Sequence, residues 1–430
     1  MNARGSTARS GRPIASAILP DKTIVESIYS PERQKTSFLA WRNEELEERD
    51  VLEASHGRLV PYAPTNNLLS HRVILLPSGA QEYGGTASLV GGIRAFIHRY
   101  ADLSEAFEEV AACYVLMSWI YDSFNELPYL RLKGDFGTGK SRCLQTIGSI
   151  CYRPMMASGA STVSPLFRII DAFRGTLIID ESDFRFSDEK ADIIKILNNG
   201  NARGFPLLRC EVTPSKEFNP RAFDVYGPKV IATRGPFEDP ALESRCFTEA
   251  MSGLPPRPEI PLNLPSEFHE EALQLRNQLL MYRFRTLHRD RGRLLDRDMR
   301  VDARMTQLLA PLLAVIEDPK VAARVRAVAD RKTSEMLAER EASVEAQLLD
   351  IMCQMRSDDA PLMVNDIAVR FAAAYGDDFA WPITARWVGS QLRTRLGIVP
   401  MKRRGRFVVA NEDLRLKALF ERYGLGVKPS

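Results

Sequence analysis

One short segment constrains this chain more than any other. Residues 134–141 read Gly-Asp-Phe-Gly-Thr-Gly-Lys-Ser and match the pattern G-x-x-x-x-G-K-[ST] in full. A short apolar run precedes the segment, and a helix is expected over 141–150, which is the context that a phosphate-binding loop requires. A chance glycine-rich turn between a strand and a helix is the alternative interpretation of the bare pattern.

The chemistry of phosphate binding explains these residue types. Glycines let several backbone N–H groups wrap around a phosphate, and the helix that follows directs its positive N-terminus toward it. Lys140 would bridge the β- and γ-phosphates, and Ser141 would ligate Mg²⁺. The segment predicts that ATP and Mg²⁺ bind at Gly134, Asp135, Phe136, Gly137, Thr138, Gly139, Lys140, Ser141 and Arg142.

A second apolar run supplies the acidic half of such a site. Residues 176–181 read Thr-Leu-Ile-Ile-Asp-Glu, so that two carboxylates end a buried strand 40 residues after Lys140. Asp180 would hold Mg²⁺, and Glu181 would polarise the attacking water. Alone, this run could be a solvated strand tip; together with the phosphate loop it predicts nucleotide hydrolysis.

A third apolar strand is expected over 229–233, and its polar end is where such ATPases sense the γ-phosphate. Thr233 is the candidate sensor, with Arg234 as the second choice; an ordinary strand terminus is the alternative. Arg245 follows shortly and could complete a neighbouring subunit's site, which would require a ring or filament of subunits. A surface salt bridge is the other interpretation of Arg245.

Composition excludes several other classes of protein. The 430 residues suffice for about three domains. The strongly apolar stretch at 110–121 is too short to cross a membrane, and the first residues lack the apolar core of a secretion signal. Six cysteines without a C-x-x-C pair and only five histidines disfavour zinc sites and disulfides, so we expect a cytoplasmic protein.

The order of sequence patterns predicts an α/β protein with several parts. Strand and helix patterns alternate over 128–250, and a proline-rich break follows near 254–261. We expect a disordered arm (1–22), a small β-rich domain (23–87), an ATPase core with leading helices (88–255), a helical lid (256–340) and a winged helix-turn-helix (341–430).

Over roughly residues 90–330 the chain resembles the AAA+ ATPases, and among them the minichromosome-maintenance (MCM) type of replicative helicase carried by mobile elements and phages. Residues 244–247, Ser-Arg-Cys-Phe, are similar to the Ser-Arg-Phe signature whose arginine acts in trans, which the resemblance assigns to Arg245. Residues 302–309 look like the start of the family's lid helix, which makes Arg304 the second sensor. The chain departs from the family at Thr233, where asparagine is usual, and it lacks the long insertion after the phosphate loop.

Two β-like runs at 205–212 and 221–226 flank a turn-rich tip and predict a hairpin. By resemblance to MCM and superfamily 3 helicases, this hairpin would project into a ring channel and Lys216 at its tip would touch the DNA backbone. A solvated hairpin is the alternative. Farther along, the arginines of 283–300 alternate with aspartates, which indicates a salt-bridged helix face.

The last part of the chain holds the positive charge. Residues 384–430 carry 11 basic and 3 acidic side chains, whereas the whole chain has a net charge of only +3. Three expected helices and a basic ribbon over 343–410 describe a winged helix-turn-helix. Its DNA contacts would be Arg386, Gln391, Arg393, Lys402, Arg403, Arg404 and Arg406, with Arg395 beside them. A basic cap or a protein-interaction module is the alternative.

Together these patterns predict a ring-forming ATPase, by resemblance a hexamer, that unwinds DNA during replication of a mobile element, phage or plasmid. Its partners would be single-stranded and forked DNA and other replication proteins. A replication initiator or helicase loader that remodels DNA without unwinding it is the main alternative. A DNA-binding regulator with a nucleotide-locked switch is a third, which the pair Asp180 and Glu181 disfavours.

Overall fold

The computed structural model describes most of the chain, and its contacts separate two compact units. The first unit covers Met1–Asp330 and the second covers Arg331–Ser430. The described residues are 11–54, 57–158, 163–180, 188–212, 218–289, 303–341, 343–356, 361–376, 379, 381–410, 414–423 and 425.

The first unit is built around a five-stranded parallel sheet. Its strands are β8 (Tyr129–Lys133), β9 (Met155–Ser158), β10 (Leu177–Asp180), β13 (Lys229–Thr233) and β14 (Cys246–Ala250). They run in the order β14-β8-β13-β10-β9, and every neighbouring pair is parallel. Strands covered on both faces read as continuous apolar runs, which is why β10 and β13 could be located in the sequence. Strand β8, which contains Arg131, was located by the phosphate-loop motif that follows it. The α/β class predicted for 128–250 is confirmed.

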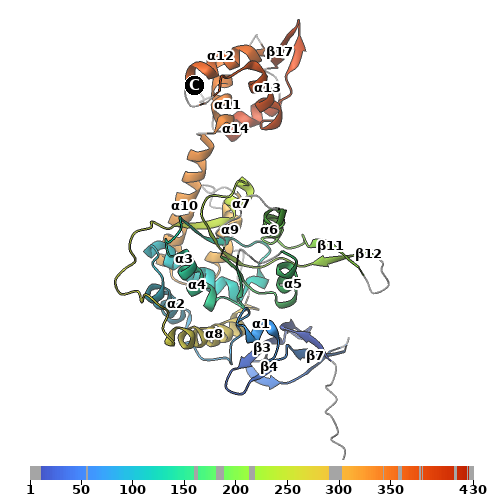
Figure 1. Ribbon diagram of the computed structural model, residues 1–430, viewed down its shortest axis with the longest axis vertical. Helices are drawn as coiled ribbons and strands as arrows, with labels where there is room; N and C mark the ends of the chain where they lie inside the picture. The colour runs from blue at the N-terminus through green and yellow to red at the C-terminus, as the bar shows by residue number, and fades with distance from the viewer. Residues whose placement is uncertain are drawn as a thin grey trace, which may run out of the picture. The chain divides into compact units, whose positions relative to one another are not determined.

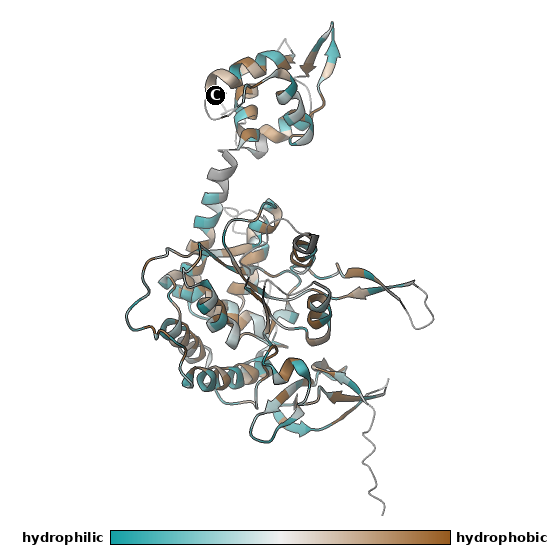
Figure 2. Ribbon diagram, viewed as in Figure 1, coloured by the Kyte–Doolittle hydropathy of each residue, from teal (hydrophilic) through white to brown (hydrophobic). Residues whose placement is uncertain are grey.

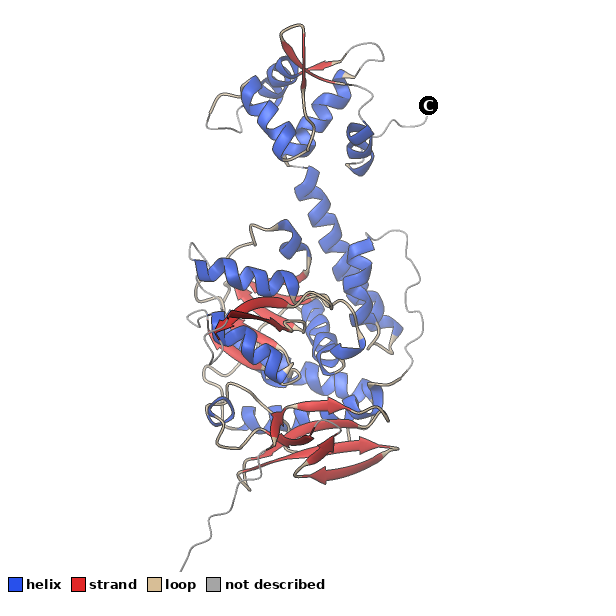
Figure 3. Ribbon diagram, turned by 90° about the vertical axis from the view of Figure 1, so that its right-hand side faces the viewer, coloured by secondary structure: helices blue, strands red, loops and turns tan. Residues whose placement is uncertain are grey.

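Helices cover this sheet on both sides (Figure 3). They are α2 (Thr86–Tyr100), α3 (Glu105–Trp119), the short η1 (Tyr121–Ser123), α4 (Lys140–Ile150), α5 (Val163–Phe173), α6 (Asp188–Asn199), α7 (Pro240–Ser244), α8 (Glu267–Thr286) and α9 (Ala303–Leu313). Helix α4 packs on β8, β13 and β10, and α8 packs against α2, α3 and α4. Helix α10 (Pro319–Glu341) continues the chain into the second unit. Among the described helices, none has the length and apolarity needed to cross a membrane.

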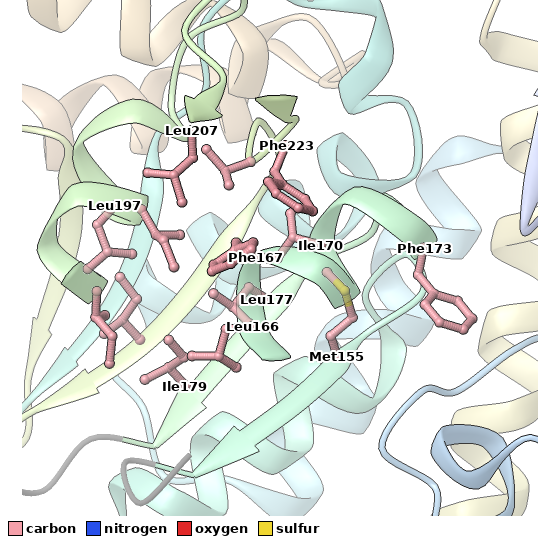
Figure 4. Packing of buried hydrophobic residues seen from close by; sticks show 14 of the residues in the cluster. Met155, Leu166, Phe167, Ile170, Phe173, Leu177, Ile179, Leu197, Leu207 and Phe223 are labelled. Atoms are coloured by element: carbon pink, nitrogen blue, oxygen red, sulfur yellow. The ribbon is translucent and has the colours of Figure 1, made fainter. Parts of the chain in front are cut away.

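One hydrophobic cluster joins α5, α6 and the sheet. Leu166 and Ile170 lie on the same face of α5 and pack toward Leu177 and Ile179 of β10 (Figure 4). The cluster continues to Phe223, whose ring lies edge-on to Phe167 at a centroid distance of 4.6 Å. Helix α5 is coloured mostly as hydrophobic in Figure 2, and the face that carries Leu166 and Ile170 is the buried one.

The N-terminal strands form two small sheets. They are β1 (Arg12–Ile14), β2 (Ser16–Ile18), β3 (Ile24–Ser30), β4 (Lys35–Arg42), β5 (Glu45–Arg49), β6 (Leu52–Ala54) and β7 (Gly57–Pro61), followed by the short helix α1 (Asn67–Ser70). Their orders are β2-β3-β4-β5 and β1-β7-β6.

The disordered arm expected over 1–22 is wrong for residues 12–18, which form β1 and β2. Ala15 between these strands is buried, and its carbonyl accepts a 2.9 Å hydrogen bond from the backbone N–H of Ser27. Each strand has only three residues, too few to show a hydrophobic alternation in the sequence, which is why the strands were missed.

The expected hairpin is present as β11 (Leu207–Val212) and β12 (Phe218–Phe223). The two strands pair antiparallel from Leu207 with Phe223 to Val212 with Phe218. They extend away from α5 and α6 as a two-stranded ribbon (Figure 1). Its expected tip, with Lys216, lies outside the described residues.

The second unit folds around its own core. Its elements are α11 (Val344–Met355), β15 (Leu362–Met363), α12 (Val364–Tyr375), α13 (Ala385–Thr394), β16 (Met401–Arg403), β17 (Arg406–Val409) and α14 (Leu414–Arg422). The strands form an antiparallel sheet in the order β15-β17-β16. Leu349, Phe371, Val388 and Leu392 are among the residues of the core.

Candidate active site

The phosphate loop connects β8 to α4 and depends on three glycines. Gly137 and Gly139 have φ angles of 79° and 85°, which side-chain-bearing residues rarely adopt. A Cβ on Gly134 would lie 2.9 Å from both Met251 Cβ and Thr138 Oγ1. Gly139 caps α4 without a side-chain hydrogen bond, so the first backbone N–H groups of the helix offer donors and positive charge to an anion.

Lys140 is anchored within the loop. Its residue exposure is 8%, and its Nζ donates to the carbonyl oxygen of Asp135. Thr138 Oγ1 donates to the same carbonyl at 2.9 Å. Burial lowers the pKa of Lys140, the charge of Asp180 opposes this shift, and the charge of Arg234 reinforces it. Asp180 and Arg234 therefore both act electrostatically on the ammonium group that the sequence assigned to the phosphates.

The order of the strands explains this convergence. Asp180 ends β10 and Thr233 ends β13, the strand that separates β10 from β8. The ends of parallel strands meet at one edge of the sheet, and two strand spacings leave about 10 Å between β8 and β10. Lys140, which follows β8, and Asp180, which ends β10, therefore lie at the same edge of the sheet.

The donors at this edge suit Mg²⁺. Ser141 is exposed at the start of α4 and Asp180 is half-buried. No group of three or more His, Cys, Asp or Glu side chains that could hold a metal occurs within the described ranges. Mg²⁺ does not need one, because it is usually held by one or two protein oxygens together with substrate phosphates and water. Glu181, the expected polarising base, lies outside the described residues.

A cavity of about 600 Å³ adjoins the phosphate loop and was not expected from the sequence. It is lined by the loop itself, by Asp102 and Ser104 between α2 and α3, and by residues of the segment 249–262. The Ser104 backbone N–H donates to Glu249 Oε1 at 2.8 Å, and Arg257 Nε lies 3.0 Å from Asp102 Oδ1. A volume of this size accommodates a nucleoside.

The proline-rich segment forms one wall of this cavity. We expected a break between domains near 254–261; instead, Arg142 reaches from α4 and donates to the carbonyl oxygens of Pro261 (2.9 Å) and Leu262 (2.6 Å). The guanidinium of Arg142 is therefore committed to this wall. In the sequence, this wall was marked only by its many prolines. Prolines indicate a stiff segment but do not indicate which cavity the segment borders.

The two sensor candidates at the end of β13 differ in their surroundings. Thr233 is 3% exposed, and its hydroxyl donates to the carbonyl of Gly235 at 3.0 Å. Arg234 is exposed, and its charge acts on Lys140. The hydroxyl of Thr233 is thus used in a local hydrogen bond, whereas the charge of Arg234 acts on the lysine of the phosphate loop.

Arg245 lies at the opposite edge of the sheet. Its carbonyl accepts a 2.9 Å hydrogen bond from the backbone N–H of Tyr129, the first residue of β8, whereas the phosphate loop follows the last residue of that strand. Four residue steps of about 3.3 Å separate these positions by roughly 13 Å before the loop begins. Arg245 therefore lies far from the phosphate loop of its own chain.

Arg304 shares the surroundings of Arg245. The Nη2 of Arg304 donates to the carbonyl of Ala241 in α7 at 3.0 Å, while the Nη1 of Arg245 donates to Asn198 Oδ1 at the end of α6. Burial lowers the pKa of Arg245, and the charge of Arg304 acts in the same direction. The two arginines form one positively charged site at the amino edge of the sheet.

The basic candidates of the second unit lie on its surface. Arg386 and Arg393 are exposed on α13, Gln391 is half-buried, and Arg395 instead pairs with Glu345 of α11 at 2.8 Å. The exposed basic residues of the β16–β17 ribbon are Lys402, Arg403, Arg404 and Arg406. Positive φ angles at Arg404 (47°) and Gly405 (80°) close this ribbon with a tight hairpin turn.

Comparison with known proteins gives matches to solved structures only. No family model matches it, and no curated protein matches its sequence. Similar solved structures include the apo C-terminal region of NrS-1 (9% identity, 90% of this chain and 96% of that chain, TM-score 0.39). Others are the SCCmec type IV Cch, described as an active helicase (11% identity, 97% and 100%, TM-score 0.33), and Drosophila ORC bound to DNA (13% identity, 82% and 97%, TM-score 0.20). Because these TM-scores are low, we infer the function from the residues of the site.

Proposed function

We propose that the chain is a Mg²⁺-dependent ATPase of the AAA+ type that works as a ring of identical subunits, most simply a hexamer. One observation carries the proposal: Lys140 and Asp180 lie at the carboxyl edge of the sheet, whereas Arg245 and Arg304 lie at the amino edge. A second copy of the chain can bring the two edges together across an interface. The complete site then consists of one subunit's phosphate loop and its neighbour's arginines.

Each described residue is given a role from its position, and Glu181 from its place in the sequence. Lys140 and the first N–H groups of α4 would bind the phosphates, and Ser141 and Asp180 would hold Mg²⁺, which would neutralise charge on the phosphate oxygens. Glu181 polarises the attacking water, and Arg234 or Thr233 senses the γ-phosphate. Arg245 of a neighbouring subunit stabilises the charge that develops as the phosphate bond breaks.

The second unit supports DNA as the partner. Its element order is α11-β15-α12-α13-β16-β17, with β17 between the other two strands. This order supports the proposal of a winged helix-turn-helix, in which α13 would enter a major groove. The exposed cations of α13 and of the β16–β17 ribbon would contact phosphates. With the hairpin of β11 and β12 as the translocating element, we infer an MCM-like helicase that replicates a mobile element, phage or plasmid.

The test is strand displacement on forked DNA with Mg²⁺ and ATP. The wild-type chain should separate the strands, and Lys140→Ala should abolish both hydrolysis and displacement while DNA binding through the second unit is retained. ATP hydrolysis without displacement would contradict the helicase assignment and favour the initiator or loader. Absence of ATP hydrolysis by the wild-type chain would contradict the whole proposal.

A further inference from the structure

The second unit carries a groove that the phosphate-loop site does not use. It lies between the first turn of α12, one side of α13 and strand β17, and its volume is about 540 Å³. Val364, Gly389 and Phe407 contribute apolar surface, and Arg386, Arg393 and Arg406 contribute charge. A concave site of this size with a few charged groups is typical of a small-ligand or nucleotide site.

Phe407 is the most unusual residue of the groove. Its exposure is 52%, although a phenylalanine ring normally seeks burial. On β17, Val409 points to the same face two residues later and is buried in the core, so Phe407 extends that face beyond the edge of the core. Lys402 lies directly across the ribbon from Phe407. The ring is therefore held on a paired strand with a cation beside it.

Gly389 keeps the floor of the groove open. It is buried in α13 midway between Arg386 and Arg393, which lie seven residues apart and so on one face of the helix. A Cβ at this position would contact Val364 Cγ1 and Arg393 Nη1 at 3.8 Å, so any larger side chain would occupy the floor. Across the groove, Arg406 Nη1 lies 3.6 Å from Met363 Sδ.

We propose that this groove binds one unpaired nucleotide of single-stranded DNA, with the base stacked on Phe407 and its flanking phosphates held by Arg386, Arg393 and Arg406. The inference rests on the proposed function only in taking DNA as the partner. Positive charge on both sides of an exposed ring matches a base with a phosphate on either side. In a duplex the faces of each base are covered by its neighbours, so the stacking contact is open only to unpaired DNA. Asp366 in the first turn of α12 also lines the groove. Its negative charge would repel a third phosphate, so the neutral base is the part of the nucleotide that we place beside it.

The experiment measures binding of the full-length chain to fluorescein-labelled oligothymidylate and to a blunt duplex of equal length by fluorescence anisotropy. Phe407→Ala and Phe407→Leu should each weaken single-strand binding about tenfold, because both remove the ring, while duplex affinity changes less than twofold. Lys402→Ala should weaken binding of the single strand and of the duplex by the same factor, since both substrates offer phosphates to this lysine. Val399→Ala removes another exposed apolar side chain (70%) outside the groove and should change neither.

The outcomes separate this inference from the proposed function. Equal loss on single strand and duplex, or no loss for the two Phe407 variants, would overturn the nucleotide groove while leaving DNA binding intact. Failure of the wild-type chain to bind either substrate would overturn DNA as the partner and, with it, both proposals. Phe407→Tyr keeps an aromatic ring and should retain the wild-type affinity for single-stranded DNA, whereas Phe407→Leu should lose it.

Discussion

At the scale of single residues, the phosphate loop combines two different steric demands. Gly137 and Gly139 are required by their positive φ angles, whereas Gly134 is required by the close approach of Met251 and Thr138. The pattern of the motif predicts all three glycines but does not distinguish these reasons. The contact with Met251 joins the loop to the chain segment that forms the wall of the adjoining cavity.

Gly134→Ala should therefore displace either the loop or Met251. We expect ATP affinity to fall at least tenfold, with about 1–3 kcal/mol lost in unfolding free energy from overpacking. Titration with a fluorescent ATP analogue and urea unfolding measure the two effects. Gly91→Ala is the matched control, because its Cβ would meet nothing within 4 Å on an exposed turn of α2. Equal ATP affinities for the two variants would refute the steric role of Gly134.

At the scale of elements, the sequence was most informative where burial is complete. The apolar runs that become β10 and β13 were located because both faces of each strand are covered, and the hairpin strands β11 and β12 because turn residues separate them. Strands β1 and β2 were missed because three residues are too few to show an alternating pattern. The proline-rich wall of the cavity was missed because prolines in a sequence predict a bend but do not predict which residues the bend will pack against. The edge of the sheet on which Arg245 lies follows from strand pairing, which no local pattern encodes.

The β11–β12 hairpin is the element on which translocation depends in this account. Lys216→Ala should keep at least half of the wild-type ATP hydrolysis and lose most strand displacement, because it removes a contact to the DNA backbone and leaves the phosphate loop intact. Lys320→Ala, an exposed lysine in the first turn of α10, is the control and should leave both activities unchanged. Normal unwinding by Lys216→Ala would show that the hairpin is only a solvated extension.

At the scale of the first unit as a whole, a buried ionic network joins the N-terminal strands to the ATPase core. Arg283 of α8 donates to Glu26 of β3 (2.7 Å) and to Asp122 of η1 (2.6 Å), and Arg153 after α4 donates to Glu26 (2.9 Å). Burial opposes ionisation of Asp122, yet the Arg283 guanidinium holds its pKa below the ordinary 3.8. The salt-bridged face predicted for the arginines of 283–300 stays a prediction, because its aspartates at 290–300 lie outside the described residues. Arg283 and Arg285 form ion pairs with other partners, Glu26 and Asp122 for Arg283 and Glu82 for Arg285.

Asp122→Asn should lower the free energy of unfolding by about 2 kcal/mol at neutral pH, because it removes a charged acceptor from a buried arginine. The pKa of Asp122 is depressed in the folded state, so its contribution is present above pH 3.8 and is lost as the pH falls through the folded value. The difference between wild type and variant should therefore shrink in acid. Urea unfolding at two pH values measures it.

Glu82→Gln provides the comparison, because it removes the partner of Arg285, an exposed arginine of the same helix α8. It breaks the pair between Glu82 and Arg285, whose side chains are 66% and 36% exposed, and should cost less than about 0.5 kcal/mol because solvent screens such a pair. Equal effects of Asp122→Asn and Glu82→Gln would contradict the role of burial in the network.

The most direct test of the central claim, an active site shared between two subunits, is ATP hydrolysis by a mixture of two inactive variants. Lys140→Ala and Arg245→Ala should each be nearly inactive alone, because each lacks one half of every site. In mixed rings, about one interface in four pairs an intact phosphate loop with an intact arginine, so an equal mixture should recover roughly a quarter of wild-type hydrolysis. A mixture no more active than the mean of its two components would contradict the shared site.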